Sequence, residues 1–362
     1  MTSYDLGRIA LALVANGKGI LAADETVPTL TKRFDTLKIQ STAQSRCAYR
    51  EMLFTSPGAA AFISGVIMHD ETIRQKNSGG IPLAEVLRAQ SILPGIKVDT
   101  GAKPLAGSPD ETVTEGLDGL RDRLSEYRAM GACFAKWRAV IRPTDTLPSA
   151  ACVSANAHAL GRYAALCQEQ GLVPIVEPEV LMDGSHTIER CGDVTGVVLS
   201  AVFDALREQG VALEGILLKP NMAIAGKACS RQASIEEVAV ATLHYLRQHV
   251  PVAVPGIVFL SGGQVHGSRP LISTQLTDYP ARDRGGSVSP MGERCKIPPW
   301  RRGMGRRTIC WRDSKPSTAG AASTPQRVRG STWMRWKRYR HCLTIRHTVA
   351  TDARTDAQNN DT

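Results

Sequence analysis

Short apolar segments alternate with longer segments of helical periodicity along the first 264 residues, and no other feature restricts the fold as much. Seven segments are apolar runs of four to eight residues, and they span 19–24, 62–68, 96–99, 134–138, 173–179, 216–220 and 256–263. Helix-like stretches between them include 110–130, 154–170 and 234–249, the last with a capped start at Ser234. This alternation is typical of a parallel sheet covered on both faces. The chain is therefore predicted to be an α/β protein.

Most of the seven runs end in charged or polar residues. These residues are Asp24, Lys97, Asp99, Lys136, Arg138, Glu177, Glu179, Lys219 and the segment Ser261-Gly262-Gly263. A (β/α)₈ TIM barrel carries its active site at the carboxyl ends of its strands, so it accounts for reactive groups at nearly every strand end. We therefore predict a (β/α)₈ barrel whose eighth strand is lost from the sequence. A doubly wound sheet is the alternative, but it would not need a reactive group at so many strand ends.

Three lysines lie in otherwise apolar runs, at Lys97, Lys136 and Lys219. A single charged strand end is most often a solvated or salt-bridged terminus. Several lysines in buried strands are different, because buried charges need partners. Desolvation and a neighbouring like charge both favour the neutral amine, which is the form that attacks a carbonyl. Lysines at barrel strand ends beside carboxylates therefore indicate a Schiff-base aldolase.

Six motifs give residues 5–264 a resemblance to the class I fructose-bisphosphate aldolases. In chain order they read GKGILAADE, GIKVD, FAKWR, VPIVEPE, LLKPNM and FLSGGQ. The resemblance implies reversible retro-aldol cleavage of fructose 1,6-bisphosphate to dihydroxyacetone phosphate and glyceraldehyde 3-phosphate, within glycolysis. It also implies that neither a metal nor a cofactor takes part.

The resemblance assigns a role to each of five catalytic residues. Lys219 would form the imine with the ketone carbon of the substrate. Glu177 would move protons as the carbinolamine forms and loses water. Asp24 would take the proton of the C4 hydroxyl, and Lys136 would assist the imine chemistry and orient Asp24. Glu179 would hold the lysine side chains in register.

Two further sets of residues are implied in binding the substrate's phosphates. The first is the loop Ser261, Gly262 and Gly263, whose backbone N–H groups can point at an anion. The second set comprises Thr26, Thr29, Lys32 and Arg33, with Lys97 and Arg138 also lining the cavity. This second region departs from the family pattern, because Val27-Pro28 replaces a Thr-Gly pair. Pro28 has no backbone N–H to donate to a phosphate.

The last 98 residues differ in composition from the rest. Residues 1–264 contain 25 Lys/Arg and 27 Asp/Glu, whereas residues 265–362 contain 19 and 7. The net charge of +10 therefore arises from a tail at +12 and a remainder at −2. One interpretation is a basic, Trp-containing tail that binds RNA or DNA. We instead expect residues 1–264 to form strands 1–7 of the barrel and residues 265–362 to be an aberrant tail, disordered or derived from a frameshift.

A shifted reading frame explains the tail. When the third base of each codon joins the first two of the next, with synonymous codons chosen freely, residues 271–279 can spell HLNAINRL. In the same frame residues 286–296 can spell FSLSYGRALQ, and residues 301–307 can spell AWHGKA. These segments resemble the family's own HLNA-N, SFSYGRAL and AW-GK, in the same order. We therefore infer a change of frame in or near residues 265–270, which would remove the eighth strand.

The remaining expectations concern partners and location. Small sugar phosphates are the expected partners, with no nucleic acid and no membrane, since no apolar run reaches membrane-spanning length. The N-terminus lacks a signal-peptide pattern and the nine cysteines are scattered, which indicates a cytoplasmic protein with reduced thiols. The resemblance alone suggests a homotetramer. The sequence leaves open the choice between fructose 1,6-bisphosphate and fructose 1-phosphate, and it leaves an inactive aldolase remnant as the alternative.

Overall fold

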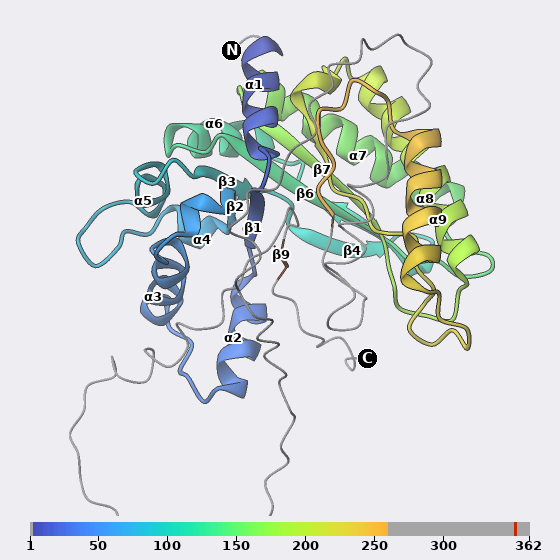
Figure 1. The fold of residues 1–362 in the computed structure, drawn as a ribbon, viewed down its shortest axis with the longest axis horizontal. Coiled ribbons are helices and arrows are strands. Elements are labelled where there is room, and N and C mark those ends of the chain that lie inside the picture. Colours follow the sequence, from blue (N-terminus) through green and yellow to red (C-terminus); the bar gives the residue numbers. More distant parts are fainter. Residues whose placement is uncertain (1–2, 260–350, 353–362) are drawn as a thin grey trace, which may run out of the picture. The chain divides into compact units, whose positions relative to one another are not determined.

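The computed structural model describes residues 3–259 and 351–352, which belong to one compact unit made of residues 1–279 and 345–362. A second unit, residues 280–344, lies outside the described residues. Strands and helices alternate through the first unit (Figure 1). The main sheet contains β1 (Gly19–Ala23), β2 (Ile63–Met68), β3 (Leu93–Lys97), β6 (Phe134–Ile141), β7 (Val173–Val180), β8 (Leu217–Leu218) and β9 (Thr351–Asp352). The described α-helices are α1 (Ser3–Leu13), α2 (Val27–Thr36), α3 (Ala43–Phe54), α4 (Asp70–Ile73), α5 (Leu83–Arg88), α6 (Leu120–Ala129), α7 (Ala150–Glu169), α8 (Ile188–Glu208) and α9 (Ile235–His249).

From β1 to β8 the strands of the main sheet follow one another in the order of the chain, and β9 lies on the other side of β1. The sheet order is β8-β7-β6-β3-β2-β1-β9, and every neighbouring pair is parallel. Leu218 of β8 also forms a parallel bridge with Ile257, in the seventh apolar run. Consecutive parallel strands joined by helices are the arrangement of a (β/α)₈ barrel, whereas a doubly wound sheet would reverse its strand order. The predicted fold class is confirmed.

The barrel is open within the described residues. β1 pairs with β9 at two positions only, Leu21 with Thr351 and Ala22 with Asp352. No pairing among the described residues joins β9 to residues 256–259 at the other edge of the sheet. A two-residue strand leaves most of the neighbouring backbone groups of β1 without ladder partners from β9. The described part of the chain thus agrees with a barrel that has lost its full eighth strand.

The predicted helix over residues 110–130 is wrong in its first half. Ser108–Glu115 forms β5, which pairs antiparallel with β4 (Gly101–Leu105), and α6 begins only at Leu120. The segment ETVTE at 111–115 contains three consecutive β-branched residues between two acidic ones, and β-branched residues favour a strand. Gly107 makes the hairpin turn at a φ of +78°, which other residues rarely adopt.

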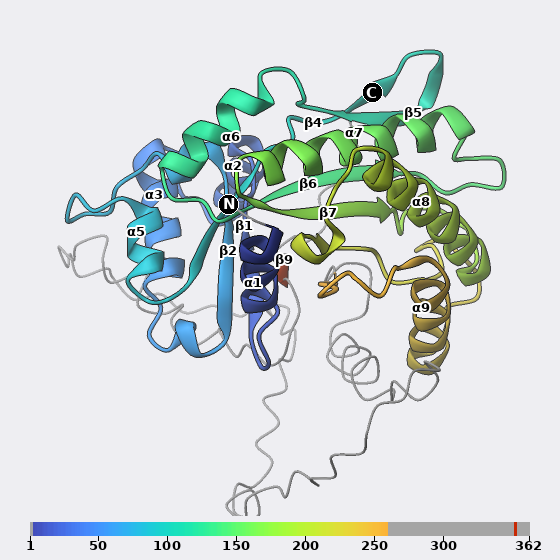
Figure 2. The same cartoon turned by 90° about the horizontal axis from the view of Figure 1, so that it is seen from above.

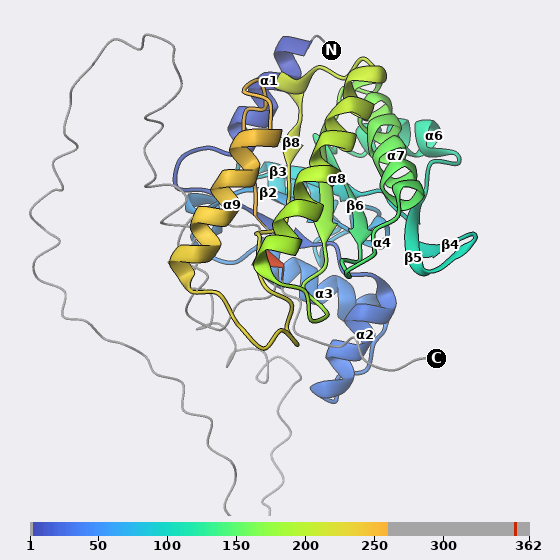
Figure 3. The same cartoon turned by 90° about the vertical axis from the view of Figure 1, so that its right-hand side faces the viewer.

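Helices α7, α8 and α9 cover one flank of the sheet in chain order (Figures 2 and 3). The capped start predicted at Ser234 is confirmed, because its side chain accepts a hydrogen bond from Glu237 N at 3.2 Å. Glu237 Oε2 in turn accepts one from Ser234 N at 2.7 Å, which completes a capping box. The sequence therefore encodes where this last helix begins.

Burial follows the apolar runs. Every residue of β2 and of β7 is buried, and in β7 this includes Glu177 and Glu179. Carboxylates enclosed in this way need counter-charges or hydrogen-bond donors.

The six cysteines among the described residues are free. No helix in this part of the chain is long and apolar enough to cross a membrane.

The contact between α8 and α9 provides a test of the packing. A methyl group added at Gly192 of α8 would lie 1.8 Å from Cε2 of Tyr245, whereas one at Gly7 of α1 would lie 3.4 Å from its nearest neighbour. Gly192→Ala should therefore lower the free energy of unfolding by about 1–3 kcal/mol. Gly7→Ala should raise it by about 0.5–1 kcal/mol, since alanine is the better helix former. Urea unfolding of both variants measures the difference, and equal stabilities would contradict the close α8–α9 contact.

Candidate active site

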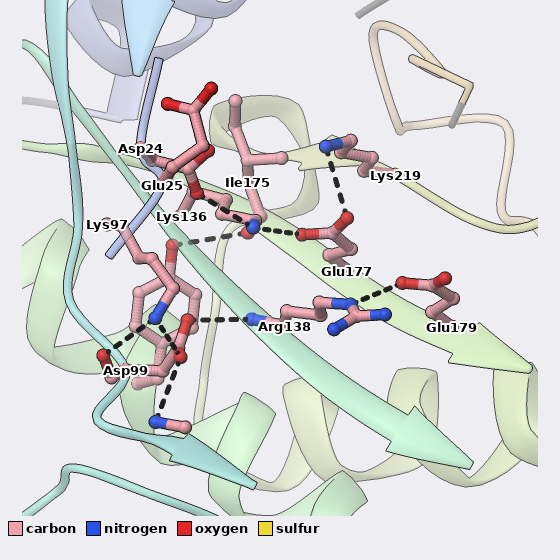
Figure 4. A network of polar contacts seen from close by, with 12 residues as sticks. Asp24, Glu25, Lys97, Asp99, Lys136, Arg138, Ile175, Glu177, Glu179 and Lys219 are labelled. Atoms are coloured by element: carbon pink, nitrogen blue, oxygen red, sulfur yellow. Dashed lines mark hydrogen bonds and ion pairs between the residues drawn. The ribbon is translucent and has the colours of Figure 1, made fainter. Parts of the chain in front are cut away.

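Four polar side chains that lie on or directly after β1, β6, β7 and β8 meet at one place (Figure 4). Asp24 directly follows β1, Lys136 lies in β6, Glu177 lies in β7, and Lys219 directly follows β8. Each side chain is at most 2% exposed. Neighbouring parallel strands bring these positions together, although the residues are up to 195 positions apart in the sequence. The four predicted catalytic residues therefore form one buried cluster.

Glu177 lies between the two lysines of this cluster. Its Oε2 lies 2.8 Å from Lys136 Nζ, and its Oε1 lies 3.1 Å from Lys219 Nζ. Lys136 Nζ also donates a hydrogen bond to Asp24 Oδ2 at 3.1 Å. Two ammonium groups and two carboxylates thus alternate in a chain from Asp24 to Lys219, and their formal charges balance. This balance is what allows four ionisable groups to be buried together.

The lysines determine the protonation state of Glu177. Burial raises the pKa of its carboxyl, but the positive charges of the two lysines and of Arg138 together outweigh burial and lower the pKa to about 2. Glu177 is therefore ionised at neutral pH. In that state it can accept a proton but has none to donate.

A second network lies beside the first and contains three more of the predicted residues (Figure 4). Arg138 Nε donates to Glu179 Oε2, and Lys97 Nζ lies 2.5 Å from Oδ1 of Asp99. The side chains of Lys97 and Arg138 are 11% and 22% exposed, more than the buried lysines. Glu179, predicted to hold the lysines, is thus paired with Arg138 in the structure.

The remaining predicted residues surround the start of α2. Thr26 Oγ1 lies 3.0 Å from Thr29 Oγ1, and Lys32 is exposed on the same helix. Pro28 lies in the first turn of α2, where a backbone N–H has no partner within the helix, so this helix tolerates it. The predicted phosphate loop Ser261, Gly262 and Gly263 lies outside the described residues.

Arg33 belongs to a buried ion-pair group that the sequence did not reveal. Arg33 Nη1 lies 2.5 Å from Glu25 Oε1, and Arg50 of α3 binds the other carboxylate oxygen of Glu25. Arg50 Nη2 also donates to the backbone oxygen of Glu25 at 3.1 Å. Because Glu25 follows Asp24 directly, this group fixes the end of β1. Partners 8 and 25 residues apart on two helices leave no local sequence signal.

Asn221 is a second residue that the sequence analysis did not select. Its side chain accepts a hydrogen bond from Val180 N at 3.0 Å and donates to Thr195 Oγ1 at 3.0 Å. These bonds attach the segment after Lys219 to the end of β7. The motif LLKPNM contains the signal, because a polar amide two residues after a buried strand-end lysine needs internal partners.

The fold and the strand-end cluster are those of a (β/α)₈-barrel enzyme. The family model for fructose-bisphosphate aldolase class-I matches residues 5–274, and the chain belongs to this family. It is 59% identical over 264 residues to a probable fructose-bisphosphate aldolase class 1 of Xanthomonas axonopodis pv. citri, covering 73% of this chain and 79% of the relative. It is 50% identical over 261 residues to fructose-bisphosphate aldolase C of Rattus norvegicus, covering 72% of each chain.

A solved structure supports the same placement. The chain resembles fructose-bisphosphate aldolase from Plasmodium falciparum, solved in complex with TRAP and a small-molecule inhibitor, with a TM-score of 0.74 and 46% sequence identity. The match covers 76% of this chain and 80% of that one. The predicted family is therefore confirmed, and the relatives are lyases of glycolysis.

The ion pairs of Glu25 provide a stability test. Glu25→Gln removes the counter-charge of Arg50, whose side chain is 2% exposed, and breaking a buried pair from one side typically costs about 3–5 kcal/mol. The matched control is Asp204→Asn, which breaks a surface pair with Arg207 whose side chains are 61% and 75% exposed. The control should leave the free energy of unfolding unchanged within error. Urea unfolding measures the free energy of unfolding of both variants. Equal losses would show that the ion pairs of Glu25 contribute no more to stability than the surface pair does.

Proposed function

We propose that this chain cleaves fructose 1,6-bisphosphate into dihydroxyacetone phosphate and glyceraldehyde 3-phosphate through an imine on Lys219. Membership of the class I aldolase family supports the reaction. The observation that carries the mechanism is the placement of Glu177 within 3.1 Å of both buried lysine amines. A carboxylate in this position can take a proton from an ammonium group and return it to a departing hydroxyl.

The electrostatics of the cluster explain how Glu177 serves as both base and acid. The charge of Lys219 is one of the causes that lower the Glu177 pKa. When Lys219 gives up its proton and adds to the ketone carbon, that charge disappears and proton uptake by Glu177 becomes easier. The proton can then go to the carbinolamine hydroxyl, which leaves as water and yields the iminium ion. Lys136 remains beside Glu177 and limits how long the carboxyl stays protonated.

The bond cleavage follows from the iminium ion and Asp24. The protonated imine accepts the electron pair of the C3–C4 bond, which stabilises the carbanion left on the three-carbon fragment. Asp24, held by Lys136 at 3.1 Å, takes the proton of the C4 hydroxyl as that bond breaks. Glu179 keeps Arg138 in place beside this cluster.

Two sets of residues are proposed to bind the two phosphates of the substrate. We assign one phosphate to Ser261, Gly262 and Gly263 by the family resemblance alone. We assign the other to a set on and before α2 and beside the buried cluster, which comprises Thr26, Thr29, Lys32, Arg33, Lys97 and Arg138. We also propose that the chain is cytoplasmic and binds sugar phosphates and neither nucleic acid nor membrane, and, from the family alone, that it forms a homotetramer.

Chemical trapping tests the imine. Borohydride reduction in the presence of dihydroxyacetone phosphate should attach the three-carbon unit to Lys219, and peptide mapping locates the label. Lys219→Arg should abolish labelling, because a guanidinium does not form the imine. Lys103→Arg, at an exposed lysine of β4, should label like the parent chain. A label on Lys136 in place of Lys219 would overturn the assignment.

We further infer that residues 1–264 are the aldolase barrel and that residues 265–362 are translated from a shifted frame. The tail as written has 19 Lys/Arg in 98 residues, and its charge opposes burial as a barrel strand. An eighth strand would pair with both open edges of the sheet and enclose its inward-facing side chains. Within the described residues β9 supplies only two paired positions of that strand.

Restoring the frame tests this inference. The chain as written should be poorly soluble or weakly active, and the frame-restored chain should be a competent aldolase with a higher melting temperature. Both are expressed in parallel and assayed for cleavage of fructose 1,6-bisphosphate. Equal turnover together with equal melting would mean that the tail completes the barrel and that the frameshift inference is wrong. Resequencing the gene across the codons for residues 260–275 gives an independent check.

A further inference from the structure

Asp99 is a buried carboxylate for which the proposed mechanism has no role. It lies two residues beyond the end of β3, and its side chain is 3% exposed. Its Oδ1 lies 2.5 Å from Lys97 Nζ and accepts a hydrogen bond from Gly101 N at 3.2 Å. Its Oδ2 accepts one from Arg138 N at 3.2 Å (Figure 4). One side chain therefore connects the end of β3, the start of β4 and the middle of β6.

These contacts fix two cations beside the buried cluster. Lys97 Nζ donates to the backbone oxygen of Asp99 at 3.1 Å as well as to its carboxylate. An ammonium group has three N–H donors, and within the described part of the chain Asp99 uses two of them, which leaves the third for a ligand. The bond to Arg138 N sets the backbone position from which that guanidinium extends. A lysine side chain otherwise has many rotamers, and ordering them on binding costs free energy.

We propose that Asp99 is a positioning residue that preorganises Lys97 and Arg138 for the substrate phosphate remote from the imine carbon. This proposal rests on the proposed function and adds a specific role to it. Asp99 touches neither the reacting carbon atoms nor Lys219, so its effect reaches the reaction through the two cations. It should therefore act on binding of the bisphosphate more than on imine formation.

Because Asp99 is negatively charged, the direction in which its neutralisation changes substrate binding tests the proposal. A carboxylate beside Lys97 repels a phosphate, so if Asp99 were only a counter-ion, its neutralisation would strengthen binding of the substrate. If Asp99 positions the cations, neutralisation weakens binding even though the site becomes more positive. Asp99→Asn separates these cases, because the amide keeps the shape of the side chain and loses the ion pair.

A second variant separates charge from position. Asp99→Glu retains the negative charge but moves the carboxylate outward by one methylene group. If charge alone matters, this variant binds like the parent chain. If position matters, it binds the bisphosphate less well. Asp99→Glu keeps the negative charge, so it can be used for the test if Asp99→Asn does not fold.

The experiment uses the full chain and measures half-saturation of borohydride trapping at Lys219, so it does not depend on turnover. Fructose 1,6-bisphosphate carries the remote phosphate, and dihydroxyacetone phosphate lacks it. For both variants the half-saturating concentration of the bisphosphate should rise by about tenfold or more, as expected for a weakened charge-assisted hydrogen bond. The value for dihydroxyacetone phosphate and the trapping rate at saturation should stay near those of the parent. Asp122→Asn, at an exposed aspartate of α6, removes the same charge elsewhere and should change neither value.

Each other result overturns a defined statement. Tighter binding of the bisphosphate to Asp99→Asn would make Asp99 a simple counter-ion. Equal losses for both ligands would assign it a general structural role, and unchanged binding in both variants would remove it from the site. Failure of both the parent chain and its frame-restored form to trap either ligand would refute the proposed imine function itself, which keeps that failure distinct from failure of the Asp99 proposal.

Discussion

The contact of Glu177 with Lys136 and Lys219 is the interaction on which the rest of the site depends. Two ammonium groups within 3.1 Å of one carboxylate are stable in a buried site only if the charges balance, and Asp24 supplies the second carboxylate. The cluster is therefore a unit, since removal of any member leaves a buried charge without its partner. In the proposed mechanism, the same coupling allows Glu177 to change from base to acid when the charge on Lys219 is lost.

The order of the sheet is what makes this cluster possible. Asp24, Lys136, Glu177 and Lys219 come from four different strands or from the residues directly after them, and the parallel pairing of β6 with β7 places Arg138 beside Glu177 and Val140 beside Glu179. Side chains two residues apart on a strand point to the same side, so Lys136 and Arg138 face the same way, as do Glu177 and Glu179. The pairing of β3 with β6 places Lys97 beside Lys136. The proposed catalytic groups and the proposed anion-binding cations are thus neighbours on adjacent strands.

The sequence predicted those features that have a strong local signal. Apolar runs indicated the strands. Charged residues at the ends of these runs indicated the site, because a charged side chain in a buried strand needs partners that compensate its charge. The capped start of α9 also has a local signal, because Ser234 and Glu237 are only three residues apart. Residues 108–115 were misassigned because the run of three β-branched residues at 112–114 is short and lies among acidic residues. The ion pair of Arg50 with Glu25 joins α3 to the end of β1, and Asp99 acts through the pairing of three strands, so neither could be found without the tertiary structure.

The inferred position of the frame change separates two parts of the proposed function. Asp24, Lys136, Glu177 and Lys219 all precede residue 220, and their contacts form wholly within the described residues. The element that the inferred shift would remove is the eighth strand, and with it the closure of the barrel. In the proposed mechanism, formation of the imine depends on the charge balance among these four residues, which that loss leaves in place. A chain whose family resemblance ends after the apolar run at 256–263 would therefore keep the groups for the proposed chemical step and lose the strand that joins the two open edges of the sheet.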